Sequence, residues 1–450
     1  MKRMFKVRLI AAGGSLVGVL GWASPAMDLL QAHEAAGRAF QADAGDPADE
    51  AAPPATRDEY LRLAFARNAG LRAAFERWRA ALERVPQARS LEDPALTFEY
   101  FTEQVDTRYQ FGIVQMFPAL GVRRLRQDRE ASEARAAMHA FDAERFALFG
   151  RVVRAVHEYG YLAQETEATA DILSLLASLE ESAAARYRSG ESSLGEWTRT
   201  QIERERMAAQ LAMLRDKRAL ESSGLAALLN LPAGNEPLPW PKLESLAPDT
   251  LDEAPLLALL EDLNPELKAA AAEIDAARQG RDLIRRSGWP APMLGVNAMV
   301  MPGMEGGGGE TDVSLMAGIS VPLWRGRIRA GVREAAAQIR AAEQERDELR
   351  NRVRNELAMA VFQFRDAARR VELYRNSLIP AAERALEAER QAYAAGQSDV
   401  AGLIEAQRSV LEFRLLAARA EADREIAMAD VGCCVGALDV RVAGQRQEDR

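Results

Sequence analysis

Two hydrophobic patterns divide this chain, one with the period of an α-helix and one with the period of a β-strand. Residues 121–187 and 326–393 are rich in Ala, Leu, Arg and Glu, and Pro380 is their only proline. Each stretch is expected to form one very long helix of about 100 Å, at 1.5 Å per residue. Helices of this length favour a coiled-coil assembly, and Pro380 should kink the second one locally.

A period of two appears before each long helix. The even positions of 293–301 and the odd positions of 313–321 are apolar, whereas the positions between them include small or polar residues such as Gly295, Asn297, Ser314 and Ser320. Segments 96–100 and 111–117 repeat this pattern in the first half. Such alternation over about 9–11 residues is typical of membrane β-strands, although a half-buried sheet in a soluble α+β domain has the same pattern. Four strands cannot close a barrel by themselves in lipid, whereas three copies with four strands each would.

The two halves of the chain resemble each other. Landmarks recur in the same order at offsets of 196, 198, 204 and 206: Asn68 with Asn264, Pro94 with Pro292, Pro118 with Pro322, and Gly190 with Gly396. The offset grows across the Gly-rich segment 303–309, which indicates a longer loop in the second half. We therefore expect a duplicated unit of helix, strand pair, long helix, tight turn and further helix, typical of a pseudo-symmetric protomer.

The termini and the linker divide the chain further. Residues 1–26 combine basic residues, an apolar run and a small-residue end, which indicates a secretory signal peptide. An anchor helix is the alternative, but the apolar run is shorter than the ~20 residues that a span needs. Residues 27–56 are expected to be extended or disordered. The first repeat then covers 57–231, a Pro-rich linker 232–250, the second repeat 251–438, and a charged tail 439–450.

Charge and reactive side chains exclude several classes of function. The chain is 28% charged with a net charge of −9, and its basic residues are interleaved with acids, which argues against a nucleic-acid partner. The adjacent Cys433 and Cys434 suit neither a disulfide framework nor a zinc site and are interpreted as packing residues. The three histidines lie far apart in the sequence, and no catalytic motif is present. We expect no enzyme activity, no metal site and no cofactor.

Four segments together carry a family resemblance. They are 378–386 (LIPAAERAL), 393–399 (YAAGQSD), 403–407 (LIEAQ) and the strand-to-helix junction 321–326 (VPLWRG). With the duplication, they make residues 57–438 resemble the TolC-type outer-membrane efflux factors. The resemblance implies an α+β membrane protein, a homotrimer with a 12-stranded β-barrel in the cell outer membrane and a periplasmic α-helical barrel. It also implies an exit duct that contacts outer-membrane lipid and passively conducts substrates from an inner-membrane pump and a periplasmic adaptor.

In that family, the adaptor and pump dock at the turns between paired helices. The matching residues here are Arg188, Ser189 and Gly190 in the first half, and Ala395, Gly396, Gln397 and Ser398 in the second. Gly190 and Gly396 suit the left-handed backbone that such turns require, although any helical hairpin needs a glycine. Their equivalent placement in both halves favours a pair of docking tips.

Family members narrow the duct near these turns with acidic side chains and bonds between helices. Tyr393 and Glu405 match positions of this periplasmic constriction, although Glu405 also fits a solvated helix residue. Two positions depart from the family pattern, because Ser398 stands where many members have a basic residue and Gly402 where they have an acidic one. The resemblance therefore implies closed-state bonding that is weaker or arranged differently.

Three methionines are candidate lumen contacts for cargo. Met299, Met301 and Met316 fall on the small or polar strand faces, and thioether sulfur suits Cu(I) or Ag(I). The sequence also has the general character of the heavy-metal branch of the family more than of its drug branch. Methionine as a flexible filler is the simpler interpretation. Two other functions stay open, the duct of a type I protein-secretion system and a soluble periplasmic coiled-coil scaffold.

Overall fold

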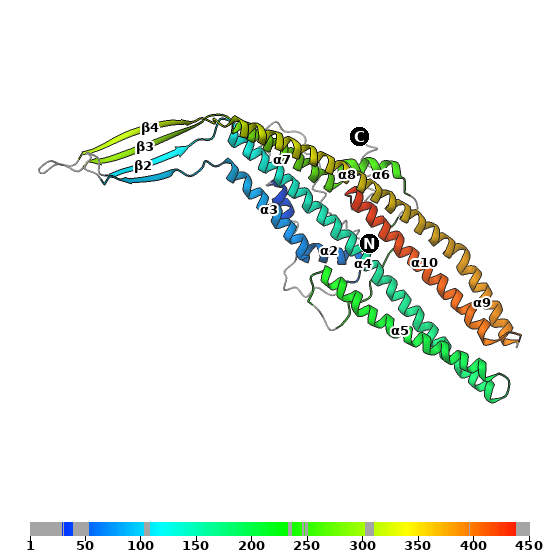
Figure 1. Ribbon diagram of the computed structural model, residues 1–450. Helices are drawn as coiled ribbons and strands as arrows, with labels where there is room; N and C mark the ends of the chain where they lie inside the picture. The colour runs from blue at the N-terminus through cyan, green and yellow to red at the C-terminus, as the bar shows by residue number, and fades with distance from the viewer. Residues whose placement is uncertain are drawn as a thin grey trace, which may run out of the picture. The chain divides into compact units, whose positions relative to one another are not determined.

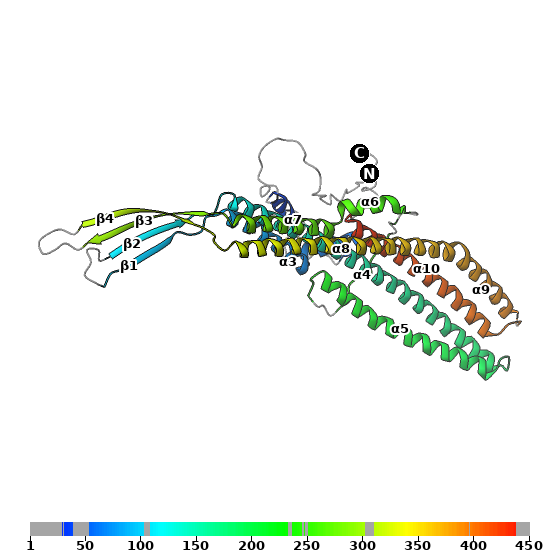
Figure 2. The same ribbon diagram turned by 45° about the horizontal axis from the view of Figure 1, so that its top comes forward.

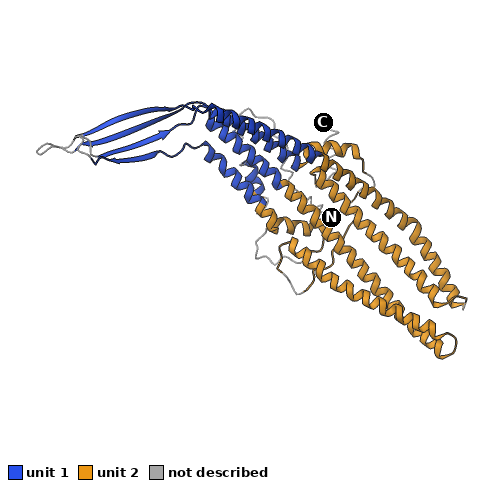
Figure 3. Ribbon diagram, in the orientation of Figure 1, with its two compact units in different colours: residues 1–36, 74–141, 265–350 blue, residues 37–73, 142–264, 351–450 orange. Residues whose placement is uncertain are grey.

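The computed structural model describes residues 29, 31–38, 54–102, 109–232, 236–244, 247, 251–301, 310–395 and 397–437. The signal peptide expected at 1–26, the tail expected at 439–450 and Gly396 lie outside the described residues. The chain forms two compact units (Figure 3): residues 1–36, 74–141 and 265–350 make up unit 1, and residues 37–73, 142–264 and 351–450 make up unit 2. Each unit therefore combines pieces of both expected repeats.

Unit 1 contains one antiparallel sheet with the strand order β1-β2-β3-β4 (Figure 1). Its strands are β1 (Ala95–Tyr100), β2 (Tyr109–Met116), β3 (Ala291–Met301) and β4 (Glu310–Ser320). The central pairing of β2 with β3 joins the two repeats. The four strands predicted from the alternation are confirmed, with small differences at their ends.

The register gives this sheet one apolar face. Neighbouring cross-strand rows on that face are Leu96, Ile113, Val296 and Leu315, and then Phe98, Phe111, Ala298 and Val313. Most of these side chains are exposed in the protomer, and Leu315 is 85% accessible. On the opposite face, Thr97, Gly112, Asn297 and Ser314 form one row. The strand alternation therefore presents an apolar surface outward from the chain's own core.

Each strand of the sheet connects to a helix. Helix α3 (Ala69–Arg89) leads into β1 and α7 (Pro265–Arg286) leads into β3. Helix α4 (Val122–Arg188) follows β2 and α8 (Arg325–Leu373) follows β4. Of α3, α4 and α8, only the parts within 74–141 and 265–350 belong to unit 1.

Residues 31–38 are helical, which differs from the extended or disordered segment expected for 27–56. In unit 1, His33 stacks on Phe75 with ring centroids 4.5 Å apart and meets the edge of Trp78 at 5.0 Å. Aromatic contacts bring large buried area from few residues, so a segment of poor apolar composition can still pack. The expectation is wrong for these residues.

The two long helices differ from each other. Helix α4 is unbroken over 67 residues, whereas the second is divided into α8, the π-helical segment η1 (Tyr374–Leu378) and α9 (Ile379–Ala394). Proline cannot donate a backbone hydrogen bond, and its ring clashes with the carbonyl four residues before it. For Pro380 that carbonyl belongs to Asn376, inside η1, so the wide π turn is the local disturbance predicted at Pro380. Among the described residues, no helix is apolar enough over a sufficient length to span a membrane.

Unit 2 is built mainly from helical hairpins. The later part of α4 runs beside α5 (Leu194–Leu228), and α9 runs beside α10 (Val400–Val435) (Figures 1 and 2). The short helices α2 (Arg57–Arg67) and α6 (Glu253–Leu263) complete it. Its core contains Tyr60, Leu148, Tyr159, Leu214 and Phe364, all less than 2% exposed.

Both repeats use the same buried asparagine. Asn68 follows α2 and donates its side-chain amide to the Leu228 carbonyl at the end of α5, at 2.9 Å. Asn264 follows α6 and donates in the same way to the Cys434 carbonyl near the end of α10, at 2.8 Å. The backbone at both asparagines has nearly the same angles, with φ of −58° and −55°. This shared contact supports the duplication inferred from the sequence.

The described part of the Pro-rich linker packs against α4 and α5 of unit 2. The ring of Trp240 lies 4.6 Å from that of Tyr159, and the Arg218 guanidinium lies 4.2 Å from the Trp240 ring centroid. The Tyr159 hydroxyl donates to the Leu238 carbonyl at 2.5 Å, and the Leu238 amide donates to Ser222 Oγ at 2.7 Å. These hydrogen bonds and ring contacts fix the segment to the two helices.

Candidate functional site

The first candidate tip is the turn between α4 and α5. Its Gly190 has a φ of +79°, the left-handed conformation predicted for this glycine. The Glu191 amide donates to the Arg186 carbonyl at 2.8 Å, which closes the end of α4. Ser193 then caps α5, because its hydroxyl accepts from the Glu196 amide at 3.2 Å. Arg188 and Ser189 are exposed at this turn.

The second candidate tip is the turn between α9 and α10. The Gln397 amide donates to the Ala392 carbonyl at 2.8 Å, so the last turn of α9 is closed as in the first tip. Asp399 caps α10, because its carboxylate accepts from the Gly402 amide at 3.0 Å. Ala395 and Gln397 are exposed and Ser398 is half-buried, whereas Gly396 lies outside the described residues.

The two departures from the family pattern meet at one carboxylate. The Ser398 hydroxyl donates a short hydrogen bond to the Glu389 carboxylate. A Cβ atom at position 402 would overlap the same carboxylate, so Gly402 leaves the space that Glu389 occupies. The sequence reasoning found Ser398 and Gly402 but missed Glu389. The sequence alone could not indicate this contact, because Glu389 meets the start of α10 only when α9 and α10 pack as a hairpin.

Contacts between the two hairpins link the tips within unit 2. The Arg186 guanidinium of α4 lies 5.1 Å from the ring centroid of Tyr393 on α9. Arg199 of α5 lies 3.8 Å from the carboxylate of Asp399. Behind these pairs, a buried cluster joins α4, α5 and α10 through Ile172, Leu176, Met207, Val400 and Ile404. The structure therefore brings both predicted docking turns to one place.

Tyr393 and Glu405 have different surroundings. Tyr393 is half-buried and packs on the apolar clusters between the hairpins. Glu405 has a 73% exposed side chain, and its nearest cation is Arg408, one helical turn away at 3.6 Å. The role in a periplasmic constriction stays a prediction for both residues.

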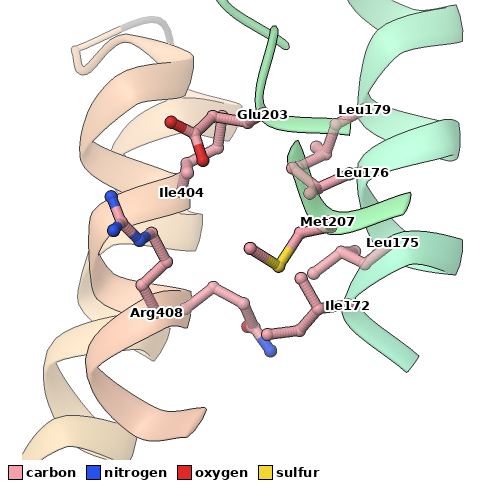
Figure 4. Close-up of a pocket in the computed structure, with 9 residues that line it drawn as sticks. Ile172, Leu175, Leu176, Leu179, Glu203, Met207, Ile404 and Arg408 are labelled. Carbon is pink, nitrogen blue, oxygen red and sulfur yellow. The ribbon is translucent and has the colours of Figure 1, made fainter. Parts of the chain in front are cut away.

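A small cavity lies between the hairpins of unit 2 (Figure 4). Ile172, Leu176 and Met207 line it together with Ile404 and Arg408, among others. Its volume is about 20 Å³, whereas small-molecule sites have roughly 300–1,000 Å³. The cavity is therefore a gap in helix packing and holds no ligand of drug size.

The strand pairing puts the three candidate methionines on one face of the sheet. Met299 lies opposite Asp312, Met301 opposite Glu310, and Met316 opposite Gly295. The same face also carries Met116 and Met293, which are paired across β2 and β3. The sequence reasoning passed over these two, although the alternation that found the others includes them. A cargo contact at Met299, Met301 and Met316 stays a prediction.

The histidines and cysteines have the surroundings of packing residues. Burial lowers the pKa of His139 and of His157 to about 4, so both imidazoles are neutral near pH 7. Cys433 donates its thiol to the Phe146 carbonyl at 3.1 Å, and burial raises its pKa to about 12. No cluster of His, Cys, Asp and Glu suited to a metal ion occurs among the described residues.

Known structures share this fold. A membrane protein from Pseudomonas aeruginosa superposes with a TM-score of 0.72 at 19% identity, over 84% of this chain and 92% of that chain. CusC gives 0.71 at 15% identity, over 85% and 92%. The outer membrane protein VceC from Vibrio cholerae gives 0.70 at 18% identity, over 85% and 97%. At these identities the likeness establishes the fold.

Sequence comparison adds the family. Residues 256–436 match the model of the outer membrane efflux proteins, and no curated protein matches the chain. An efflux protein acts by transport, which agrees with the lack of a catalytic motif in the sequence. The resemblance to TolC-type efflux factors is confirmed to this extent: residues 256–436 match the model of the outer membrane efflux protein family, and the described chain has the fold of outer-membrane proteins of known structure.

Proposed function

We propose that the protein is the outer-membrane exit duct of a tripartite efflux system, a homotrimer that conducts substrates passively. The observation that carries this proposal is the sheet of unit 1, with its exposed apolar face and two edge strands. Within the described residues, β1 and β4 each have one neighbouring strand. A sheet in lipid must have every backbone group paired, so these edges call for partner strands from other copies.

Three copies would supply this pairing. With four strands from each protomer, they would close a 12-stranded barrel in which the apolar face meets lipid and the small or polar face meets water. The long helices of the three copies would form the periplasmic helical barrel. Known structures with this fold include CusC, which forms a transmembrane channel, and the outer membrane protein VceC, and both support a membrane-embedded channel.

The orientation of the sheet can be tested at two neighbouring residues. Leu315→Arg should abolish membrane insertion, because an arginine facing the middle of the lipid costs ~2–4 kcal/mol. Ser314→Arg on the opposite face should still insert. The measurement is the amount of protein in the outer-membrane fraction, together with the mass of the detergent-extracted particle. Equal insertion of both variants would show that the lipid-facing side of the sheet is assigned wrongly, whereas a buffer-soluble monomer would favour the soluble scaffold.

The tips are proposed to dock the periplasmic adaptor and the inner-membrane pump. Their exposed residues and the contacts between the two hairpins support a common docking surface of both turns. A photo-crosslinking amino acid at Ser189 or Gln397 should capture the adaptor in cells. The same group at the exposed Arg215 of α5 is the matched control and should capture none. A pump driven by protons among the captured partners supports efflux, whereas an ATP-driven transporter with a peptidase domain would favour protein secretion.

Heavy-metal ions are the proposed cargo. Met299, Met301 and Met316 share the face that would line the lumen, and thioethers bind monovalent copper or silver weakly enough to release them. Changing all three to leucine keeps volume and apolarity nearly constant. Cells with this variant should lose copper or silver tolerance while keeping tolerance to organic toxicants. Full metal tolerance would leave the methionines as packing residues.

A further inference from the structure

The antiparallel sheet brings four connections to one of its ends. Strands β1 and β3 begin there and strands β2 and β4 finish there. The connections and the eight helical residues next to each strand occupy 82–94, 117–129, 279–290 and 321–332, all in unit 1. We call these four segments the junction edge.

The junction edge is strongly basic. It contains twelve arginines and five carboxylates, although the whole chain has a net charge of −9. This asymmetry differs from the long helices, where basic and acidic residues alternate. A local excess of one sign at one place in an acidic protein indicates a partner of the opposite sign.

Several of these arginines have no carboxylate partner. Arg126 pairs with Glu92 at 3.4 Å and Arg281 with Asp282 at 2.9 Å. By contrast, Arg325, Arg327 and Arg329 at the start of α8 are exposed and make no ion pair with any described residue. No acidic residue occupies the first turn of α8, and cations at that end oppose the helix dipole. Their charge is therefore left for an external anion.

Large apolar side chains lie between the strands and the arginines. Leu120 is 85% exposed, Leu323 76% and Trp324 79%. Trp289 is also exposed, and the Arg286 guanidinium lies 4.4 Å from its ring centroid. Tryptophan prefers the boundary between lipid and water. Along the chain from the strands to the helices, the apolar strand face comes first, the exposed tryptophans and leucines follow, and the arginines come last.

An anionic phospholipid has the same order of chemistry, with an apolar chain, a glycerol region and a charged phosphate. Arginine binds phosphate through two parallel hydrogen bonds and is less strongly hydrated than lysine. We propose that the junction edge binds the headgroups of anionic phospholipids, with Arg325, Arg327 and Arg329 as its main phosphate contacts. This inference rests on the proposed membrane location of the sheet.

The test uses the full chain purified in a neutral detergent. Phosphatidylglycerol or phosphatidylcholine is titrated in, and bound lipids are measured by native mass spectrometry. We expect tighter binding of phosphatidylglycerol, weakened by salt, and a loss of at least about tenfold in the triple variant R325Q/R327Q/R329Q. The matched control R215Q/R384Q/R390Q removes three exposed arginines of unit 2 that make no ion pair with a described residue, and it should bind like the unaltered protein.

Three results would overturn the inference. They are equal binding of both lipids by the unaltered protein, unchanged phosphatidylglycerol binding in the triple variant, and full displacement of the lipid by heparin, which would indicate a soluble polyanion instead. Membrane extraction and particle mass are measured on the same preparations. A chain that is soluble without detergent contradicts the proposed function, whereas a membrane-inserted chain without lipid preference contradicts this inference alone.

Discussion

The two repeats agree at their bases and differ at their tips. Asn68 and Asn264 make the same buried contact to the end of the last helix in their own repeat. At the tips, Ser193 and Asp399 both cap the following helix at equivalent positions, 206 residues apart. The carboxylates at the two tips, however, come from different helices of the hairpin. The first tip carries Glu196 on its second helix, 3.6 Å from Arg186, whereas the second tip has glycine at the equivalent position 402.

In the second tip, Glu389 supplies the carboxylate from the first helix of the hairpin. The equivalent position in the first tip is Ala183, which is fully buried. Backbone groups that must be paired away from water leave little choice of side chain, which explains the shared buried asparagines. The caps recur because the first amides of a helix have no partner within the helix. An acid on an exposed turn can come from either helix. Positions whose side chains pair backbone groups are therefore the same in both repeats, whereas the charged side chains at the tips can differ.

The largest expected difference between the repeats is in how their contribution to stability depends on pH. His157 is buried in the first repeat. The equivalent position in the second repeat, 204 residues later, is the buried Val361. Burial lowers the pKa of His157 from 6.5 to about 4, with Arg57 adding to the effect and Glu425 opposing it. The unfolded chain therefore binds the proton more readily. Stability should be full above about pH 6.5 and should fall on the order of 3 kcal/mol as the pH drops to about 4.

His157→Val would sharpen this comparison, because it gives the first repeat the residue of the second. Thermal unfolding of the detergent-solubilised variant from pH 7 to pH 4 should show a shallower loss of stability. Part of the loss remains, because burial also lowers the pKa of His139. An unchanged pH profile would show that His157 titrates normally.

The shared asparagine should have the same energetic weight in both repeats. Asn68→Ala and Asn264→Ala each leave a carbonyl at the end of a helix without its donor, which costs about 1–3 kcal/mol. Melting temperatures should fall by similar amounts. Asn351→Ala, at an exposed position of α8, is the control and should change stability little. A loss in only one repeat would break the equivalence.

The first tip depends on its left-handed glycine. Gly190→Ala should destabilise by about 1–2 kcal/mol, because an L-residue is strained at positive φ. Gly224→Ala, inside α5, should stabilise by about 0.5–1 kcal/mol. Neither added Cβ would meet another atom within 4 Å, so only the backbone angle distinguishes the two sites. Changes of the same sign would contradict the assigned turn.

The smallest effect is expected in the second tip. Gly402→Ala should displace the Glu389 carboxylate from Ser398, at a cost of about 1 kcal/mol, while the better helix propensity of alanine offsets much of it. The same change in a Glu389→Ala background should be stabilising. A double-mutant cycle on thermal stability measures this coupling, and purely additive effects would show that Gly402 makes no room for Glu389.

Much of the arrangement of helices and strands could be predicted because it occurs twice in the sequence. The alternation located all four strands. The offset between Asn68 and Asn264 marked two equivalent positions, and the structure shows that both asparagines make the same contact. The pairing of β2 with β3 could not be predicted, since it joins segments almost 180 residues apart that the alternation alone does not order. The helix at 31–38 was missed because its packing depends on Phe75 and Trp78, which lie far along the chain.

The candidate site was predicted less completely than the arrangement of helices and strands. Gly190 acts on its own backbone, so local sequence identified it, whereas the caps Ser193 and Asp399 were not predicted. Glu389 acts across a hairpin on Ser398 and Gly402, and the contact of Arg186 with Tyr393 crosses from one repeat to the other. Such contacts depend on how helices pack. The sequence therefore predicts the turns but leaves out the side chains that join them.

The unlike edges of the sheet have a genetic consequence. In the proposed trimer, β1 of each copy meets β4 of the next, so every seam joins two different strands and the ring has a direction. A copy with a defective β4 edge still offers a sound β1 edge and can enter a ring with normal copies. One such subunit leaves that ring open. A variant of this kind, expressed beside the normal gene, should therefore act dominantly, whereas a variant that never folds should be recessive.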